Sequence, residues 1–278
     1  VSQKKVEAAS TGKLSVTGYQ DYNDAQKILK EVNKYRKKNG RKALKMDRGL
    51  TNSAIMRGFE TTIYIPETSP HRRPNGKLSK SINKKIIYEN CAQSAGTTPK
   101  QIVKGWINSS THRKGLLLSN AKSVGVAAVT VVSRDGYEAN TWVLDFSSSK
   151  AKKVEKSKAR KQFTKNIVTK NSYLKKSYLK LDSRYGTIWE TEKMQMKPTY
   201  QGKMMKEYGV YPTVINTSSF TSWKSSNPSV ASVDSNGRIT GNKAGTATIS
   251  AKLKTGTKIT ISKKIKVVPT NQQIDPWE

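Results

Sequence analysis

The segment Gly105-Trp-Ile-Asn-Ser-Ser-Thr-His-Arg113 contains His112, one of only two histidines among the 278 residues of the chain. Just before it, Thr98-Pro99-Lys100-Gln101 combines a capping-box spacing with a proline at the first helical position, which predicts the start of a helix. The apolar face of this helix is formed by Ile102, Val103, Trp106 and Ile107. We therefore expect a helix packed on a core, followed by a histidine in a polar stretch.

Outward from this segment, two helices are predicted upstream, from about Tyr22 to Lys38 and from about Asp47 to Ile63, because apolar residues recur at helical spacing. Downstream, the β-rich runs Ser123 to Ser133 and Tyr137 to Ser147 are joined by Asp135-Gly136, a typical hairpin signal. Helices followed by an antiparallel hairpin predict an α+β domain in which helices pack on a sheet.

The other candidate site residues are His71, in Pro70-His71-Arg72-Arg73-Pro74-Asn75-Gly76, and Glu89, in Ile87-Tyr88-Glu89-Asn90-Cys91-Ala92. Imidazole ligates zinc and changes its protonation near neutral pH, but the spacing between the two histidines does not by itself bring them together. Glu89 could ligate a metal, orient a histidine, act as a base or serve as a structural carboxylate. These alternatives stay open on the residues alone.

Four segments in order resemble the bacterial branch of the CAP superfamily, also called SCP-like: His-Arg-Arg-Pro-Asn-Gly at 71–76, Glu-Asn-Cys-Ala at 89–92, the segment at 105–113, and Trp-Val-Leu-Asp-Phe at 142–146. The resemblance implies an α-β-α sandwich with a groove in which two histidines and acidic residues meet. It implies that His71 and His112 are the paired histidines and that Glu89 is the glutamate of the Gly-Glu-Asn motif. These three residues form the expected metal site, for zinc or another divalent cation.

The chain also departs from the family pattern. Tyr88 stands where the glycine of that motif is usual, Gly115 where an asparagine usually follows His-Arg, and Ser109 where many eukaryotic members have a second glutamate. Glu60 could supply the missing carboxylate, although a solvated position on its helix explains it better. Cys91 would share a face with the motif glutamate in an extended segment, but we expect an ordinary buried thiol rather than a nucleophile.

A second module is expected after a stretch rich in lysine and arginine. The segment that begins Trp223-Lys-Ser-Ser-Asn-Pro-Ser-Val and continues to Ile249 resembles the bacterial Ig-like group 2 domain, which implies an all-β immunoglobulin-like sandwich with a spacing or adhesion role. Alternating apolar residues, a tight turn at Asn236-Gly237 and the absence of a cysteine pair fit this fold. We expect a flexible N-terminal segment (1–20), a CAP domain (21–149), a basic linker (150–162), the Ig-like domain (163–269) and a tail (270–278).

Composition indicates the partners and the compartment. The chain carries 52 Lys and Arg against 19 Asp and Glu, a net charge of +33, so we expect anionic cell-envelope polymers or surfaces as partners; simple solvation of the surface is the alternative. Nucleic acid is not expected, because no helix-turn-helix, zinc-finger or RNA-binding motif accompanies the charge.

No apolar run is long enough for a transmembrane segment. Since the sequence begins at Val1, we expect that an export signal preceded it.

Taken together, these patterns predict an extracellular protein, secreted or cell-wall associated, that binds a divalent metal, a small ligand or a lipid in a groove formed by two histidines and one glutamate. The alternative is a metal-dependent hydrolase that acts on peptide or cell-envelope material, with Glu89 as the base. Because catalytic zinc usually has three protein ligands and an open position, the number of ligands distinguishes the two.

Overall fold

The computed structural model describes residues 11–63, 71–183 and 186–274, which divide into two compact units. One unit comprises residues 17–165, and the other comprises residues 166–278 together with residues 1–16. Within the described residues no helix has the length and apolarity needed to cross a membrane.

The first unit is built on a mixed sheet with the strand order β3-β5-β4-β1-β6, to which β2 adds by pairing in parallel with β4. The strands of this sheet are β1 (Thr11–Asp21), β2 (Lys45–Met46), β3 (Tyr88–Ser94), β4 (Ser123–Val132), β5 (Glu138–Ser147) and β6 (Arg160–Lys170), of which β1 belongs to this unit from Thr17 on and β6 up to Lys165. The β4–β5 ladder runs from Ser123↔Ser147 to Val132↔Glu138, which confirms the predicted hairpin. Gly136 adopts a positive φ of 83° in its turn, as the sequence signal requires.

The helices of this unit are α1 (Tyr22–Lys38), α2 (Arg48–Ile63), the one-turn η1 (Ser79–Ile82), α3 (Pro99–Asn108) and α4 (Ser110–Leu116). The side chain of Asp21 caps α1 by accepting a hydrogen bond from the backbone of Asp24 at 2.9 Å. The capping box of Thr98 and Gln101 begins α3. The predicted bounds of α1 and the start of α3 are confirmed, because both are determined by local capping.

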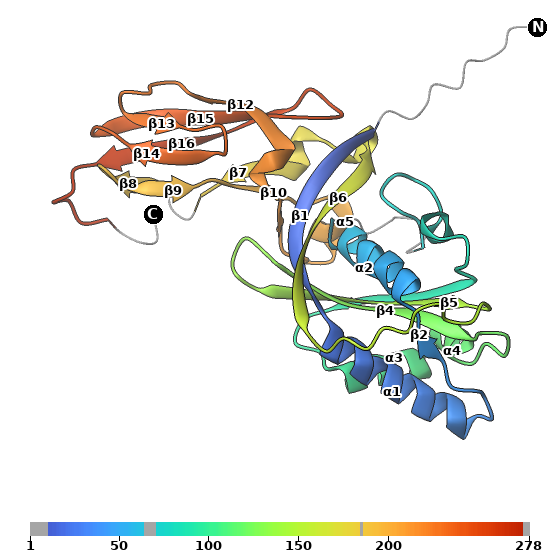
Figure 1. Cartoon of the computed structure of the whole chain (residues 1–278). Helices are drawn as coiled ribbons and strands as arrows, with labels where there is room; N and C mark the ends of the chain where they lie inside the picture. The colour runs from blue at the N-terminus through green and yellow to red at the C-terminus, as the bar shows by residue number, and fades with distance from the viewer. Residues whose placement is uncertain (1–10, 64–70, 184–185, 275–278) are drawn as a thin grey trace, which may run out of the picture. The chain divides into compact units, whose positions relative to one another are not determined.

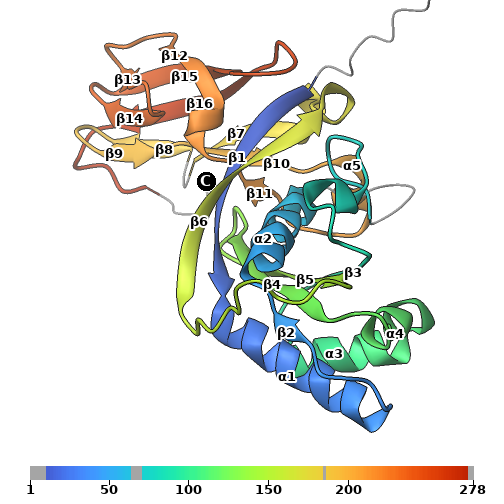
Figure 2. The ribbon, with the colours of Figure 1, turned by 45° about the vertical axis from the view of Figure 1, so that its right-hand side comes forward.

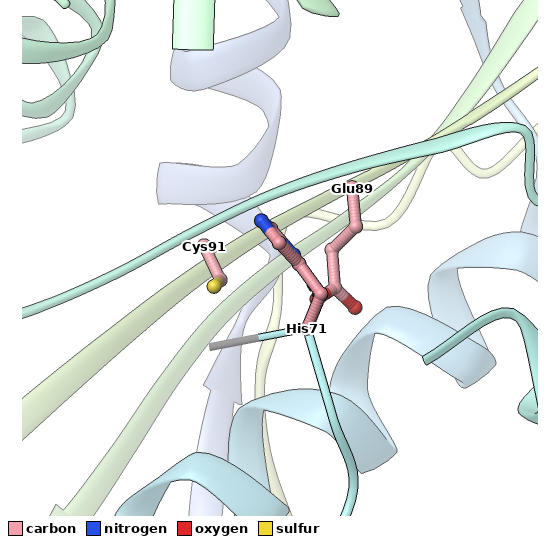
Figure 3. Close-up of side chains that lie close together, drawn as sticks. All are labelled: His71, Glu89 and Cys91. Atoms are coloured by element: carbon pink, nitrogen blue, oxygen red, sulfur yellow. Dashed lines mark hydrogen bonds and ion pairs between the residues drawn. The ribbon is translucent and has the colours of Figure 1, made fainter. Parts of the chain in front are cut away.

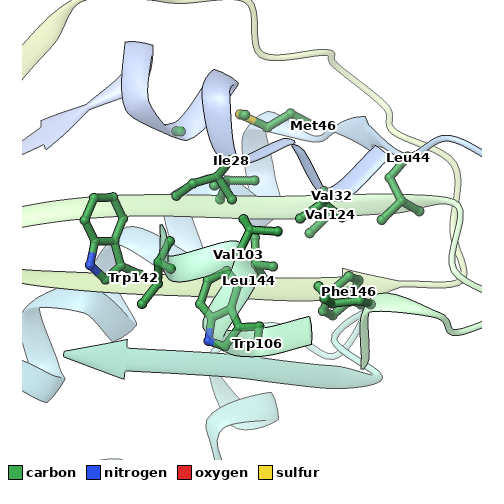
Figure 4. Packing of buried hydrophobic residues seen from close by; sticks show 14 of the residues in the cluster. Ile28, Val32, Leu44, Met46, Val103, Trp106, Val124, Trp142, Leu144 and Phe146 are labelled. Atoms are coloured by element: carbon green, nitrogen blue, oxygen red, sulfur yellow. The ribbon is translucent and has the colours of Figure 1, made fainter. Parts of the chain in front are cut away.

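Helices cover both faces of the sheet. Figures 1 and 2 show α2 on one face and α1 with α3 on the other, so the predicted three-layer α-β-α arrangement is confirmed. The main core lies between the sheet and the α1–α3 layer (Figure 4). It contains Ala25, Ile28, Val32, Leu44, Met46, Ile102, Val103, Trp106, Leu116, Ala121, Val124, Val126, Ala128, Trp142, Leu144 and Phe146. Trp142, Leu144 and Phe146 alternate toward this layer, as the sequence predicts.

Helix α2 approaches the opposite face of the sheet very closely. A Cβ at Gly125 of β4 would overlap the backbone carbonyl of Leu50, and a Cβ at Gly58 of α2 would lie 2.7 Å from Val129 Cγ2. Both glycines therefore allow helix and strand backbones to approach more closely than any side chain would permit. This close approach brings the polar side chains of α2 against residues of β3 and β5.

Two of the expected boundaries differ from the structure. Residues 1–10 of the expected flexible segment lie outside the described residues, but residues 11–20 belong to β1, where Leu14 and Val16 are fully buried. The expected linker at 150–162 packs against the first unit. Glu155 is buried and forms an ion pair with Arg48 (Nε to Oε2, 2.9 Å), and β6 begins at Arg160. The boundary between the units falls after Lys165, because these contacts outweigh the mutual repulsion of the basic side chains.

The second unit is all-β apart from the short α5 (Lys203–Glu207) and the one-turn helices η2 (Asn171–Tyr173), η3 (Lys176–Tyr178) and η4 (Thr217–Ser219). Its sheets have the orders β12-β15-β16-β8, β13-β14-β9 and β11-β10-β7. The strands are β7 (Leu179–Asp182), β8 (Thr187–Trp189), β9 (Lys193–Gln195), β10 (Lys197–Tyr200), β11 (Thr213–Val214), β12 (Phe220–Ser225), β13 (Ala231–Val233), β14 (Arg238–Gly241), β15 (Gly245–Leu253) and β16 (Thr260–Val268).

The alternation predicted for this unit is confirmed, since Ala247, Ile249 and Ala251 of β15 and Ile261, Ile265 and Val267 of β16 are buried. The turn at Asn236-Gly237 joins β13 to β14, also as predicted. Trp223 and Val233, two apolar residues of the segment that resembles the Ig-like domain, are half-buried. The expected tail at 270–278 follows β16, and its last residues, 275–278, lie outside the described residues.

Candidate functional site

Strand β3 places Glu89 beneath α2. In the β3–β5 ladder Glu89 is opposite Asp145 and Cys91 is opposite Val143, so Glu89 and Cys91 lie on the same face, as the sequence predicts for an extended segment. His71 comes from the loop that follows α2, and its Nδ1 lies 3.0 Å from Glu89 Oε1. Figure 3 shows the imidazole of His71 between the side chains of Glu89 and Cys91. The fold therefore brings two of the three expected site residues into direct contact.

Arg57 of α2 holds the Glu89 carboxylate from its other side. Its Nε donates to Glu89 Oε2 at 2.8 Å and its Nη2 donates to Glu89 Oε1 at 3.1 Å, a bidentate pair. The side chains of Arg57 and Glu89 are 0% and 2% exposed. A guanidinium and an imidazole thus position this carboxylate in the interior of the domain.

The charge network continues along α2. Arg57 Nη1 donates to Glu60 Oε2 at 2.9 Å, and Arg73 donates to the same carboxylate, with Nη2 at 2.7 Å from Oε1. Glu60 is 1% exposed, so its expected role as a solvated helix residue is wrong. The interior contains an alternating chain of charges, Arg73–Glu60–Arg57–Glu89, that ends at His71. The sequence signal for it was a pair of opposite charges, Arg57 and Glu60, three residues apart on a helix whose neighbouring residues are apolar.

These contacts determine the protonation of Glu89. Burial alone raises the pKa of its carboxyl, but hydrogen bonds from His71 and Arg57, together with the charges of both, outweigh burial and lower the pKa. Glu89 is therefore ionised at neutral pH. Because an ionised carboxylate only accepts hydrogen bonds, Nδ1 of His71 carries the proton in this contact.

His112 lies on α4, close to this group but not within it. Its Nδ1 lies 2.9 Å from Ser109 Oγ, and its backbone carbonyl accepts a hydrogen bond from Asn90 Nδ2 at 2.9 Å. Burial lowers the pKa of the His112 imidazole, a hydrogen bond with the backbone of Cys91 raises it, and the charge of His71 lowers it further. The two histidines are thus near enough to interact electrostatically, and His112 is neutral at neutral pH.

The residues fit a divalent cation only in part. The donor atoms of His71, Glu89 and Cys91 all lie within 4.8 Å of one another. Burial raises the pKa of the Cys91 thiol to about 12, so it stays a neutral, weak ligand, in agreement with the expectation that Cys91 is no nucleophile. The guanidinium of Arg57 occupies the Glu89 carboxylate and would repel a cation bound to it. Of this compact group the His71 imidazole remains as a suitable donor, with Glu89 as the group that orients it.

Asp145, on β5, is a member of the site that the sequence reasoning missed. It is fully buried, and within the described part of the chain neither carboxylate oxygen has a hydrogen-bond partner. Burial, reinforced by the charge of Glu89, raises the pKa of Asp145 well above its ordinary value. Asp145 therefore keeps its proton to a higher pH than an exposed aspartic acid does. Its signal was an acidic residue in the middle of Trp-Val-Leu-Asp-Phe, a strand with apolar residues on both sides.

Comparison with protein-family models supports the domain order. The model described as "CAP: Cysteine-rich secretory protein family" matches residues 29–146. Residues 29–146 form a CAP domain. The model described as "Bacterial Ig-like domain (group 2)" matches residues 201–265. The CAP domain is thus followed by a bacterial Ig-like domain, as the resemblance of the motifs implies, and the CAP domain contains His71, Glu89 and His112.

Among curated proteins, this chain is 31% identical over 130 residues to the uncharacterized protein YkwD of Bacillus subtilis (strain 168). The match covers 45% of this chain and 48% of YkwD, so this chain spans about half the length of that relative.

Three solved structures are similar to parts of the chain. An outer surface protein from Borrelia burgdorferi is 18% identical, with 47% of this chain and 98% of that chain covered and a TM-score of 0.35. An extracellular protein containing a SCP domain from Bacillus anthracis is 19% identical, with 45% and 41% covered and a TM-score of 0.34. An intimin mutant of EHEC O157:H7 is 23% identical, with 33% and 46% covered and a TM-score of 0.23.

Proposed function

We propose that this protein is a secreted or cell-wall-associated bacterial binding protein whose CAP domain binds a divalent cation, zinc in the first instance, through His71 and His112. The contact of His71 Nδ1 with Glu89 Oε1 carries the proposal. Metal-binding histidines commonly donate their second ring N–H to a carboxylate, which fixes the tautomer and the ring orientation. With Nδ1 directed at Glu89, Nε2 is the nitrogen through which His71 would ligate a metal.

Binding without turnover is favoured over hydrolysis by the state of Glu89. A general base for a metal-bound water needs a pKa near the working pH. The pKa of Glu89 is lowered, and Arg57 already occupies both of its oxygens. Two imidazoles are also one ligand short of the three protein ligands that are usual for catalytic zinc. The metal-dependent hydrolase is therefore the weaker alternative.

The remainder of the chain serves attachment in this proposal. A net charge of +33 attracts polyanions over roughly a Debye length, about 8 Å at physiological salt. For a bacterial protein outside the membrane, the nearest polyanions are the polymers of the cell envelope. The Ig-like domain would act as a spacer or adhesion module that holds the CAP domain at that surface.

The test is a zinc titration that is monitored by calorimetry and by NMR of the imidazole rings. The imidazole signals are simple to assign because the chain has only two histidines. His71→Ala or His112→Ala should abolish binding, and Glu89→Gln should weaken it roughly 10- to 100-fold. Cys91→Ser is the matched control and should bind as the wild type does. Unchanged zinc affinity in either histidine variant would contradict the proposal that both imidazoles bind the metal. Loss of zinc binding in Cys91→Ser would indicate instead that the ligands are the compact group of His71, Glu89 and Cys91.

A further inference from the structure

The second unit contains a pocket between two strands that belong to different sheets. Its volume is about 350 Å³, at the small end of the range of roughly 300 to 1,000 Å³ that is typical of ligand pockets. Strand β7 is the last strand of the sheet β11-β10-β7. Strand β16 pairs with β8 only over residues 266–268. At residues 261–263 the edge of β16 that faces away from β15 is therefore not covered by β8, and the pocket lies between this edge and β7.

The lining combines buried apolar residues with exposed or half-buried basic ones. Leu179, Leu181 and Ile261 are each at most 3% exposed, so a ligand in the pocket meets mainly the polar residues. The polar lining residues are Lys176, Lys180, Lys263, Ser262 and Asp182. With three ammonium groups and a single carboxylate, the pocket is strongly positive.

The three lysines are available to a ligand. Within the described part of the chain, none of them forms an ion pair with a carboxylate. Lys176 and Lys180 are exposed and Lys263 is half-buried.

More positive charge lies next to the pocket. The Nζ atoms of Lys175 and Lys206 lie 5.6 and 5.9 Å from the ring centroid of Tyr178. Lys175 directly precedes the lining residue Lys176 in the chain, and Tyr178 directly precedes β7, so this additional charge is next in sequence to two lining segments of the pocket.

We propose that this pocket binds a phosphate group carried by an anionic polymer of the cell envelope. Ammonium groups act as compact point charges toward phosphate, whose several oxygens can accept hydrogen bonds from more than one lysine at once. The inference rests on the proposed attachment to anionic envelope polymers and assigns that attachment to one site on the Ig-like unit.

The test compares two variants of the full chain with the same net charge. The pocket variant is Lys176→Gln/Lys180→Gln/Lys263→Gln. The control variant is Lys224→Gln/Lys243→Gln/Lys258→Gln, which removes three exposed lysines of the same unit that do not line the pocket. Binding of poly(glycerol phosphate) is measured by calorimetry at physiological salt, with thermal unfolding to show that both variants are folded.

Since a lysine next to an anionic surface changes affinity roughly fivefold, the pocket variant should bind about 100-fold more weakly than the wild type. The three control lysines do not line the pocket and cannot contact a phosphate bound in it, so the control variant should lose no more than about threefold. Inorganic phosphate should compete with the polymer for the wild type. Polyglutamate, an anionic polymer without phosphate, should bind the wild type and the pocket variant equally.

Three results would overturn the inference. Equal losses of affinity for poly(glycerol phosphate) in both variants would mean that the total charge of the unit determines binding. That result would contradict the pocket as a binding site but would agree with attachment to polyanions. If the pocket variant lost affinity for polyglutamate as strongly as for poly(glycerol phosphate), the pocket would have no preference for phosphate. A wild type that does not bind the phosphate polymer would overturn both the pocket and the proposed attachment, whereas zinc binding by the CAP domain would be unaffected.

Discussion

Replacing Arg57 by methionine removes the central cation of the buried charge network while keeping an apolar side chain of similar length. The variant loses the hydrogen bonds of 2.8 and 3.1 Å to Glu89 and of 2.9 Å to Glu60. It leaves two carboxylates in the interior, with His71 and Arg73 as the remaining hydrogen-bond partners described above. Removing one partner of a buried ion pair costs about 3–5 kcal/mol, because the charge that remains is neither hydrated nor neutralised. Arg57→Met should therefore lower the free energy of unfolding of the CAP domain by this amount.

The matched control is Arg48→Met on the same helix. Arg48 also pairs with a glutamate, Glu155, but the Arg48 side chain is 43% exposed. Glu155 keeps hydrogen bonds from the backbone N–H groups of Lys156 and Ser157, each at 3.0 Å, so loss of Arg48 should cost clearly less than loss of Arg57. Both variants are compared by urea denaturation, with hydrogen exchange at β4 and β5 to report on the CAP domain alone. Equal losses in Arg57→Met and Arg48→Met would refute the claim that burial determines the energy of these pairs.

The cost of Arg57→Met should also depend on pH. Since the folded pKa of Glu89 is lowered, its paired state contributes stability above the unfolded pKa, and this contribution is lost as the pH falls through the folded pKa. The difference between wild type and variant should thus be largest near neutral pH and should shrink on acidification. A difference independent of pH would show that lost packing, rather than lost charge pairing, causes the effect.

Three further predictions concern single residues. Because the folded pKa of Asp145 is raised, its neutral form contributes stability that is fully present below the unfolded pKa and is lost by about 1.4 kcal/mol per pH unit as the pH rises from the unfolded toward the folded pKa. Asp145→Asn should remove this slope in urea melts, and an unchanged slope would mean that Asp145 does not cause it. The Cys91 thiol, with a pKa of about 12, should react with iodoacetamide at neutral pH far more slowly in the folded than in the urea-unfolded chain, whereas similar rates would contradict its burial. Gly237 has a φ of 73°, and an added Cβ would lie 2.7 Å from the Trp223 ring, whereas Gly209 has a similar φ of 65° and open space around it. Gly237→Ala should therefore destabilise the Ig-like unit by about 1–3 kcal/mol more than Gly209→Ala does. Equal melting temperatures of the two variants would exclude the steric clash.

Local signals predicted the elements whose ends depend on neighbouring residues. The cap at Asp21, the capping box that starts α3 and the hairpin at Gly136 all involve contacts within a few positions in the chain, and the structure has each of them. The strand β1 was not predicted, because its partner β4 lies more than 100 positions away and its apolar residues, Leu14 and Val16, stand in a polar context. For the same reason the basic residues after Lys150 appeared to be a free linker.

The candidate site divides in a similar way. Motifs typical of the CAP family pointed to His71, Glu89 and His112, but they could not show that Glu89 would be occupied by Arg57 or that Glu60 would be buried. Asp145 was seen only as part of an apolar strand. Whether a charged group is solvated or buried depends on segments that the chain brings together from far apart.

The order of residues alone determined the elements with local signals, such as α1, the start of α3 and the β4–β5 hairpin, since caps, alternation and glycine at positive φ act over a few bonds. Only the folded structure decided in which direction the pKa of each buried carboxyl group shifts. Glu89 and Asp145 are opposite each other on neighbouring strands, yet the pKa of one is lowered and that of the other is raised. The physical reason is that desolvation acts on both, whereas the guanidinium and imidazole that counteract it are hydrogen-bonded to Glu89.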